Sequence, residues 1–259
     1  MYQSTSYALA IDTHSKLFSG MYINTSNPAI SFRTSKYKDK RILILVGQDH
    51  KTGFAPTDVE TYNTLENLAK KYYPKSEILY KWSNEDCISL DKIPYIGNYS
   101  VSDFNLYVAT GFNKWGMTSS NIAANIIKDK ILNKKNKYTF VFDSLRFKPI
   151  KNRIELKNMG KQVLKSFTKN RIQIPNEALD NIKPDNGAIV KVNGKSVGIY
   201  KDQNQKIFAV NPTCTHLGCL LTWNNLEKTW DCPCHGSRFD FTGKNLYNPA
   251  IKNLETYKI

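Results

Sequence analysis

Two short segments decide the fold of this chain: Cys214-Thr215-His216-Leu217-Gly218-Cys219 and Cys232-Pro233-Cys234-His235-Gly236-Ser237. We name residues 214–219 the first box and residues 232–237 the second box. Four of the five cysteines of the chain lie in these boxes, together with two of its four histidines. The pattern is C-x-H, fifteen further residues and then C-x-x-H, with an extra cysteine in each box. So many soft donors at this spacing predict a metal centre.

Two kinds of metal centre fit these donors. Two thiolates and two imidazoles can bind Zn²⁺ tetrahedrally. The same four groups can hold a [2Fe–2S] cluster, with two cysteines on one iron and two histidines on the other. A zinc site leaves Cys219 and Cys234 without a role. In either case Gly218 and Gly236 let backbone N–H groups approach the sulfur atoms, because glycine has no Cβ.

The sequence CTHLGC followed by CPCHGS resembles the two cluster-binding boxes of the Rieske iron–sulfur family. The resemblance implies that one iron is bound by Cys214 and Cys232, and the other by His216 and His235. It also implies a disulfide between Cys219 and Cys234, as in the respiratory-type branch of the family. Because disulfides are rare in a reducing cytosol, that pair would need shielding or an oxidising compartment.

The resemblance extends to the residues that set the reduction potential. In high-potential Rieske proteins the second box continues with a serine and, two positions later, a tyrosine, and both hydroxyls donate to sulfur. This chain keeps Ser237 but has Phe239 at the later position. We therefore expect one hydrogen bond to the cluster, from Ser237, and a potential below that of the quinol-oxidising type.

The sequence around the boxes predicts a small antiparallel β domain over residues 172–259. Asn193-Gly194, between two alternating segments, is typical of a two-residue hairpin turn. We expect strands over residues 188–192, 196–200, 206–210, 220–223, 228–230 and 238–241.

Two branches of the Rieske family do not fit the rest of the chain. Ring-hydroxylating oxygenases need a further iron held by two histidines and a carboxylate, and outside the boxes only the widely separated His14 and His50 remain. Subunits of quinol-oxidising complexes have an N-terminal membrane helix, but no stretch here approaches the ~18–20 apolar residues of a membrane span. Residues 1–4 do not resemble a secretory signal either.

Residues 1–145 predict a mixed α/β region. Strand-like segments cover residues 6–11, 20–23, 30–33, 41–46, 77–82 and 105–110. A helix is expected over residues 58–73, ended by Pro74, and a second over residues 117–132. The apolar face of the second helix would consist of Met117, Ile122, Ile126, Ile127 and Ile131.

Three segments of this region occur in a characteristic order: Lys81-Trp82-Ser83, residues 91–97 (DKIPYIG) and residues 106–112 (LYVATGF). They resemble the C-terminal half of the FAD-dependent amino-acid and amine oxidoreductases, the D-amino-acid oxidase-like family. Bacterial members with a C-terminal Rieske domain are similar over nearly the whole chain. The resemblance implies that the last glycine loop and helix start lie beside the flavin ring. The implied flavin-side residues are Gly111, Phe112, Trp115, Gly116, Met117 and Thr118.

One element of that family is absent from this sequence. Such enzymes begin with a strand and a G-x-G-x-x-G turn that binds the FAD pyrophosphate, and no G-x-G-x-x-G occurs here. We therefore expect FAD to bind only together with a missing N-terminal half, because the chain is truncated or because that half is a separate subunit.

The net charge of +15 is concentrated in the middle of the chain. Between Lys128 and Arg171 there are fourteen Lys and Arg against three acids. A basic amphipathic helix is expected over residues 152–169, within a linker over residues 146–171. We favour packing of its apolar stripe between two domains; peripheral contact with an anionic membrane is the alternative. No nucleic-acid-binding motif accompanies the charge.

The sequence therefore predicts an α+β chain with a mixed α/β flavin-oxidoreductase remnant (1–145), a basic helical linker (146–171) and an all-β Rieske [2Fe–2S] domain (172–259). The expected function is electron transfer in a flavin-dependent oxidoreductase acting on an amine or amino-acid-like substrate. The alternative is a non-catalytic Rieske electron carrier with an N-terminal docking module. We expect a cytoplasmic protein whose partner is a redox protein or the FAD-binding half.

Overall fold

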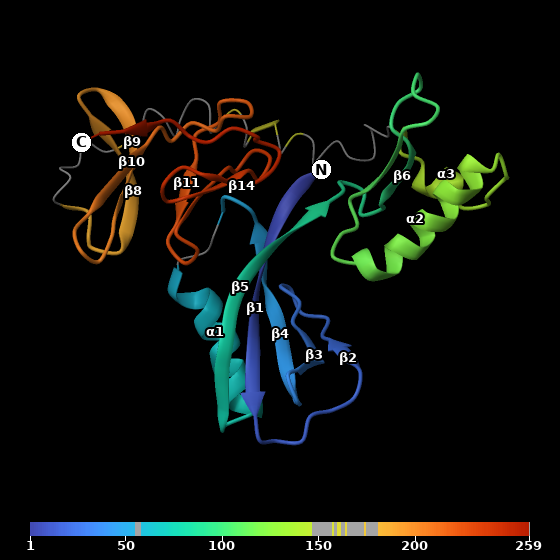
Figure 1. The fold of residues 1–259 in the computed structure, drawn as a ribbon, viewed down its shortest axis with the longest axis horizontal. Helices are drawn as coiled ribbons and strands as arrows, with labels where there is room; N and C mark the ends of the chain where they lie inside the picture. Colours follow the sequence, from blue (N-terminus) through green and yellow to red (C-terminus); the bar gives the residue numbers. More distant parts are fainter. Residues whose placement is uncertain are drawn as a thin grey trace. The chain divides into compact units, whose positions relative to one another are not determined.

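The computed structural model of the chain describes residues 1–54, 58–146, 157, 160, 161, 164, 174 and 181–258. These residues form two compact units. The first unit comprises Met1–Gln3 and Asp86–Lys165, and the second comprises Ser4–Glu85 and Ser166–Ile259 (Figure 1). The second unit thus combines the N-terminal sheet with the segment that contains both boxes.

The second unit begins with a five-stranded sheet in the order β2-β3-β4-β1-β5. Its elements are β1 (Tyr2–Thr13), β2 (Met21–Ile23), β3 (Ser31–Tyr37), β4 (Lys40–Lys51) and β5 (Ser76–Ile88), with helix α1 (Asp58–Tyr72) between β4 and β5 in the sequence. Strands β1 and β4 pair antiparallel, with Leu9 opposite Leu45.

Both faces of the two central strands are buried. On one face Leu9 and Leu45 pack with Leu65 of α1, and all three are fully buried. On the other face Ala10 packs with Ile44. Burial on both faces explains why residues 42–46 form an uninterrupted aliphatic run rather than an alternating pattern.

The segment that contains the boxes forms two four-stranded sheets. One has the order β15-β10-β9-β8, with β8 (Asn186–Val192), β9 (Lys195–Lys201), β10 (Ile207–Val210) and β15 (Thr256–Tyr257). The other has the order β11-β12-β13-β14, with β11 (Thr222–Asn224), β12 (Thr229–Asp231), β13 (Arg238–Asp240) and β14 (Asn245–Tyr247). The second box is the connection between β12 and β13.

The predicted hairpin is confirmed. Val192 pairs with Lys195, and the two residues between them have positive φ, 50° at Asn193 and 78° at Gly194. Two consecutive positive φ angles define the type I′ turn for which Asn-Gly is the preferred sequence.

The first unit contains the antiparallel pair β6 (Tyr95–Asn98) and β7 (Tyr107–Thr110), helix α2 (Gly116–Ile131) and the short helix α3 (Thr139–Phe142). Its core consists of Ile96, Ala123 and Ile126. The predicted apolar face of α2 is correct in the middle of the helix and wrong at both ends. Met117 is 87% exposed and Ile131 is 58% exposed, whereas the buried residues of α2 are Ser119, Ala123 and Ile126.

The α+β fold class is confirmed, and every predicted strand and helix outside the linker corresponds to an element. The expected helix over residues 152–169 lies largely outside the described residues; Lys157, Gly160, Lys161 and Leu164 of that segment are helical and exposed. Within the described part of the chain, no helix is long and apolar enough to cross a membrane.

Candidate metal centre

The two boxes have the same backbone geometry. In the first, the Gly218 N–H donates to the Cys214 carbonyl at 2.9 Å and the Cys214 N–H donates to the Cys219 carbonyl at 2.8 Å. In the second, the Gly236 N–H donates to the Cys232 carbonyl at 2.9 Å, and the Cys232 N–H donates to the Ser237 carbonyl at 2.8 Å. Gly218 and Gly236 have φ of 77° and 82°, so each box needs glycine to close its turn.

Cys214 and Cys232, one from each box, are buried free thiols that share a hydrogen bond. The Cys232 thiol, followed by the backbone N–H groups of His216 and Leu217, lowers the pKa of Cys214 to about 6. The same shared proton raises the pKa of Cys232. Two thiols that share a proton at a buried site can lose it when a metal cation binds, because the thiolate is the form that acts as a metal ligand.

His216 and His235 also meet between the boxes. Their ring centroids are 5.1 Å apart and the rings are nearly perpendicular. Within the described part of the chain, the Nδ1 atom of each ring is buried and has no hydrogen-bond partner, and burial lowers the pKa of His235. Imidazole rings with buried, unpartnered Nδ1 atoms are ready metal ligands.

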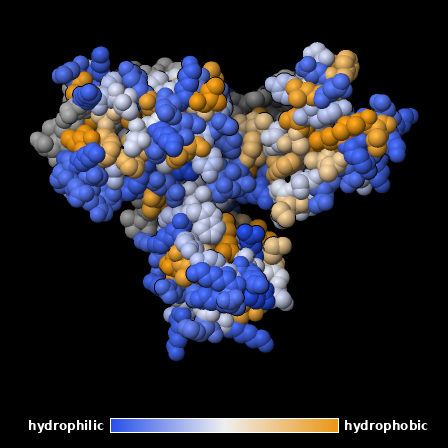
Figure 2. Space-filling view, in the orientation of Figure 1, coloured by the Kyte–Doolittle hydropathy of each residue, from blue (hydrophilic) through white to orange (hydrophobic). Residues whose placement is uncertain are grey.

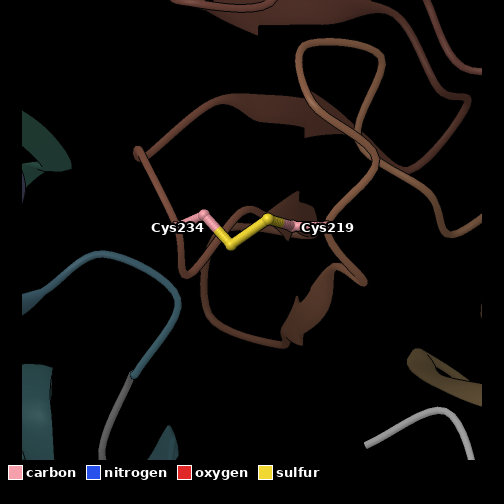
Figure 3. Close-up of a disulfide and its surroundings, with 2 residues drawn as sticks. All are labelled: Cys219 and Cys234. Carbon is pink, nitrogen blue, oxygen red and sulfur yellow. A yellow bond between two sulfur atoms is a disulfide. The ribbon is translucent and has the colours of Figure 1, made fainter. Parts of the chain in front are cut away.

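The two remaining cysteines of the boxes form a disulfide. Cys219 and Cys234 are joined with a Cα–Cα distance of 6.6 Å, and the bond connects the two boxes directly (Figure 3). Cys232 lies beside this disulfide, with its sulfur within 4.8 Å of both bonded sulfurs. Disulfide sulfurs carry no thiolate charge, so this three-cysteine group is not a ligand set.

These observations fit the group that the sequence predicts. A buried polar atom without a partner costs about 1–3 kcal/mol, and the two Nδ1 atoms bear that cost unless they bind something. Two adjacent thiols complete a set of two sulfur and two nitrogen donors. Cys214 and Cys232 would hold one iron of a [2Fe–2S] cluster, and His216 and His235 the other.

Ser237 lies beside the same thiols. Its side chain is fully buried, and its Oγ accepts a hydrogen bond from the Ala250 N–H at 2.9 Å. Its hydroxyl bonds to Cys214 and helps to lower the pKa of that thiol. Phe239, also fully buried, has no hydroxyl to add a second such bond.

A buried charge network flanks the second box, and no sequence pattern indicated it. Arg238, at the start of β13, lies 2.9 Å from Asp231 Oδ1 and 3.5 Å from Glu85 Oε1 of β5. It also donates to Ser83 Oγ at 3.1 Å. Burial raises the pKa of Glu85 to about 8, against the opposing effect of Arg238. This network attaches the box-containing segment to the five-stranded sheet.

The implied flavin-side residues form the loop between β7 and α2 and the first turn of α2. Gly111 has φ of 71°. The side-chain amide of Asn113 donates to the Gly111 carbonyl at 2.7 Å, and its Oδ1 accepts a hydrogen bond from the Ser89 N–H at 2.9 Å. Trp115 is 59% exposed and makes no side-chain cap for the helix. The loop therefore presents a rigid backbone and an exposed apolar surface, and its contact with flavin stays a prediction.

Three further residues have clear environments. His14 is exposed. The lone Cys87 is a partly buried free thiol that contacts Met1 Sδ at 3.7 Å. His50 lies near the end of β4 rather than in a loop, and its ring stacks on Tyr7 at 5.6 Å.

Comparisons with known proteins agree with both resemblances. The family described as Rieske [2Fe-2S] domain matches residues 174–258. The family described as FAD dependent oxidoreductase matches residues 1–130. Each match contains the motif on which the corresponding resemblance depends.

Three individual proteins show how far the similarity extends. The Bacillus subtilis (strain 168) protein YhfW, whose name describes a Rieske 2Fe-2S iron-sulfur protein, is 38% identical over 255 residues, which cover 98% of this chain and 50% of YhfW. The cytochrome b6-f complex iron-sulfur subunit 1 of Nostoc sp. (strain PCC 7120) is 51% identical over 47 residues, 18% of this chain and 26% of that protein. The crystal structure of glycine oxidase from Geobacillus kaustophilus has 17% identity and a TM-score of 0.46, covering 57% of this chain and 40% of that one.

The chain spans half the length of YhfW, and the flavin and iron–sulfur matches lie one after the other along it. This arrangement, together with the paired boxes and their disulfide, identifies the chain as a member of the FAD dependent oxidoreductase family that carries a Rieske [2Fe–2S] domain.

Proposed function

We propose that this chain transfers electrons one at a time through a [2Fe–2S] cluster between a flavin and an external redox partner. The observation that carries the proposal is the meeting of two free buried thiols and two unpartnered imidazole Nδ1 atoms between disulfide-linked boxes. When bound, the cluster supplies one-electron transfer and FAD supplies two-electron oxidation of substrate. The proposed substrate class, an amine or amino-acid-like compound, rests on family resemblance.

The chain's own residues have three roles in this function. Cys214, Cys232, His216 and His235 hold the cluster. The Cys219–Cys234 disulfide keeps the two boxes together when the cluster charge changes. The Ser237 hydroxyl stabilises negative charge on sulfur, which favours the reduced state.

The exposed side of the first unit supports an FAD-binding half as partner. Figure 2 shows hydrophobic side chains at the surface over β6, α2 and α3. Among residues 95–142, the most exposed large hydrophobic side chains are those of Met117, Val101, Phe140, Phe104 and Tyr99. An exposed apolar surface of this kind usually marks an interaction site, and the full length of YhfW leaves room for a further half of similar size.

We place this function in the cytoplasm, with residues 1–145, 146–171 and 172–259 as flavin-oxidoreductase remnant, linker and Rieske domain. The disulfide does not oppose this compartment. Cys219 and Cys234 are only 1% and 2% exposed, so cellular thiols have little access to them. Peripheral contact of the basic linker with an anionic membrane stays an alternative, and no observation favours nucleic acid.

The alternative function is a non-catalytic electron carrier that uses its N-terminal region only for docking. Purification from the native cells under gentle conditions separates the two. A visible spectrum with both iron–sulfur and flavin bands supports the oxidoreductase. Iron–sulfur bands alone, with no flavin in any associated subunit, support the carrier and contradict our proposal.

A further inference from the structure

The turn over residues 51–54, which follows β4, packs directly on the second box. A Cβ placed on Gly53 would lie 2.5 Å from Pro233 Cα and 2.6 Å from Pro233 N. Pro233 separates Cys232 from Cys234, so this contact falls between a proposed cluster ligand and the disulfide. The close approach is open to glycine alone, since any side chain would collide with backbone atoms, and Gly53 also has φ of 80°.

Hydrogen bonds close this turn and hold it against the box-containing segment. The Phe54 N–H donates to the Lys51 carbonyl at 3.0 Å and closes the turn. The Thr222 hydroxyl donates to the Gly53 carbonyl at 3.2 Å. Within the turn, Thr52 shares a buried hydrogen bond of 2.8 Å with Thr5 of β1. These hydrogen bonds therefore hold the turn in a defined position within the second unit.

Lys51, the first residue of the turn, brings a positive charge to this place. Its ammonium lies 5.2 Å from the centre of the Phe54 ring. Lys51 stands two positions before Gly53, so its ammonium belongs to a turn that lies directly against the second box. Partial burial lowers the pKa of Lys51, and partial burial also weakens the screening of its charge by salt.

We infer that the turn over residues 51–54 is a third part of the cluster site, beside the two boxes. In it, Gly53 positions the second box and the Lys51 ammonium raises the reduction potential of the cluster. The inference rests on the proposed cluster. Reduction adds one electron, and therefore one negative charge, to the cluster. A nearby fixed cation stabilises that charge and makes the cluster a better electron acceptor. A residue outside the Rieske match thus sets the potential of the Rieske centre.

The role of Lys51 is tested by the midpoint potential of the purified holoprotein, measured by voltammetry at one pH and ionic strength. Lys51→Met should shift the potential downward, and Lys51→Arg should keep it close to that of the unchanged protein. Lys36→Met is the matched control, because Lys36 is exposed and pairs with Arg41 at the other end of β4, roughly 33 Å from Lys51 at 3.3 Å per residue.

The results separate this inference from the proposed function. If the unchanged protein holds no [2Fe–2S] cluster, the proposed function and the inference both fail. If it holds the cluster but Lys51→Met shifts the potential no more than Lys36→Met does, the role of Lys51 is overturned and the proposed function stands.

The role of Gly53 is tested by the rate of cluster loss, followed by the decay of the visible absorbance under air. Gly53→Ala should accelerate the loss several-fold. The control is Gly194→Ala, since Gly194 has nearly the same φ, 78°, but nothing within 4 Å of an added Cβ. Equal rates in the two variants would show that backbone strain alone matters and that the turn does not support the second box.

Discussion

At the scale of single residues, the hydroxyl of Ser237 is the group that most directly connects sequence to reduction potential. It is buried, accepts a hydrogen bond from the Ala250 N–H and is hydrogen-bonded to the Cys214 thiol. Hydrogen bonds to cluster sulfurs stabilise the negative charge of the reduced state and so raise the potential. With Phe239 in place of a second donor, we expect a potential within the Rieske range of about −150 to +300 mV and below its top.

Two substitutions should move that potential in opposite directions. Ser237→Ala removes a donor and should lower the midpoint potential, whereas Phe239→Tyr adds a hydroxyl and should raise it. Both are measured by voltammetry at one fixed pH, because ligand histidines can couple electron uptake to protonation. Ser237→Thr, which keeps the hydroxyl, is the control. Unchanged potentials in both test variants would mean that another feature, such as solvent exposure, sets the value.

Glu85 should give the stability of the chain a specific dependence on pH. Its folded-state pKa is about 8, raised chiefly by burial from an ordinary value of 4.5. Between these values the folded state binds more protons than the unfolded state, so the free energy of unfolding falls as pH rises. The effect should be on the order of a few kcal/mol.

Urea unfolding at several pH values between about 5 and 8 measures this effect. Glu85→Gln keeps the shape of the side chain and cannot ionise, so its stability should fall less over this range than that of the unchanged protein. Parallel pH profiles for the two proteins would show that Glu85 is ionised in the folded state, balanced by Arg238.

Among the secondary-structure elements, the predictions succeeded where a local signal was present. The Asn193-Gly194 turn, the aliphatic run of residues 42–46 and the ends of α1 each follow from neighbouring residues. The short strands β6, β14 and β15 were not predicted. The contact of Gly53 with Pro233 and the pair Arg238–Glu85 join residues far apart in sequence. Local sequence patterns therefore do not predict them.

The disulfide links the first and second boxes. Its removal should lower the stability of the bound cluster without preventing the ligands from binding iron. A double variant, Cys219→Ser with Cys234→Ser, should still assemble the cluster but lose it sooner. In the chain-entropy view, closing a loop of about 15 residues contributes about 3 kcal/mol. Iron content and the half-life of the visible spectrum measure the two effects. Complete absence of iron after anaerobic purification would argue that these cysteines are ligands.

For the whole molecule, the candidate site was easier to propose from sequence than the way in which the chain divides. Each box is contiguous, so its candidate donors could be named from the sequence, and the family resemblance implied the disulfide that the structure contains. The compact units are discontinuous in sequence, because the division between them falls within β1, after Gln3, and within β5, after Glu85. Sequence order gives no sign of such a division.

The chain by itself should bind FAD weakly or not at all. Pyrophosphate recognition needs a glycine turn at a helix N-terminus, and this sequence contains no G-x-G-x-x-G. Equilibrium dialysis of the purified chain with FAD measures the affinity, with the iron–sulfur bands as a check of folding. Flavin bound at one per chain would show that another segment, or a second copy, supplies the site.

The central claim is that Cys214, Cys232, His216 and His235 hold a [2Fe–2S] cluster, and its most direct test counts the nitrogens on the iron. The chain is produced with ¹⁵N-labelled histidine, purified without oxygen, assayed for metal and reduced. Electron–nuclear double resonance then reports nitrogens coupled to the cluster spin. We predict two irons per chain and two coupled histidine nitrogens, with the Rieske-type signal lost in His235→Ala and kept in His14→Ala. One zinc per chain, or a cluster without histidine coupling, would contradict the account.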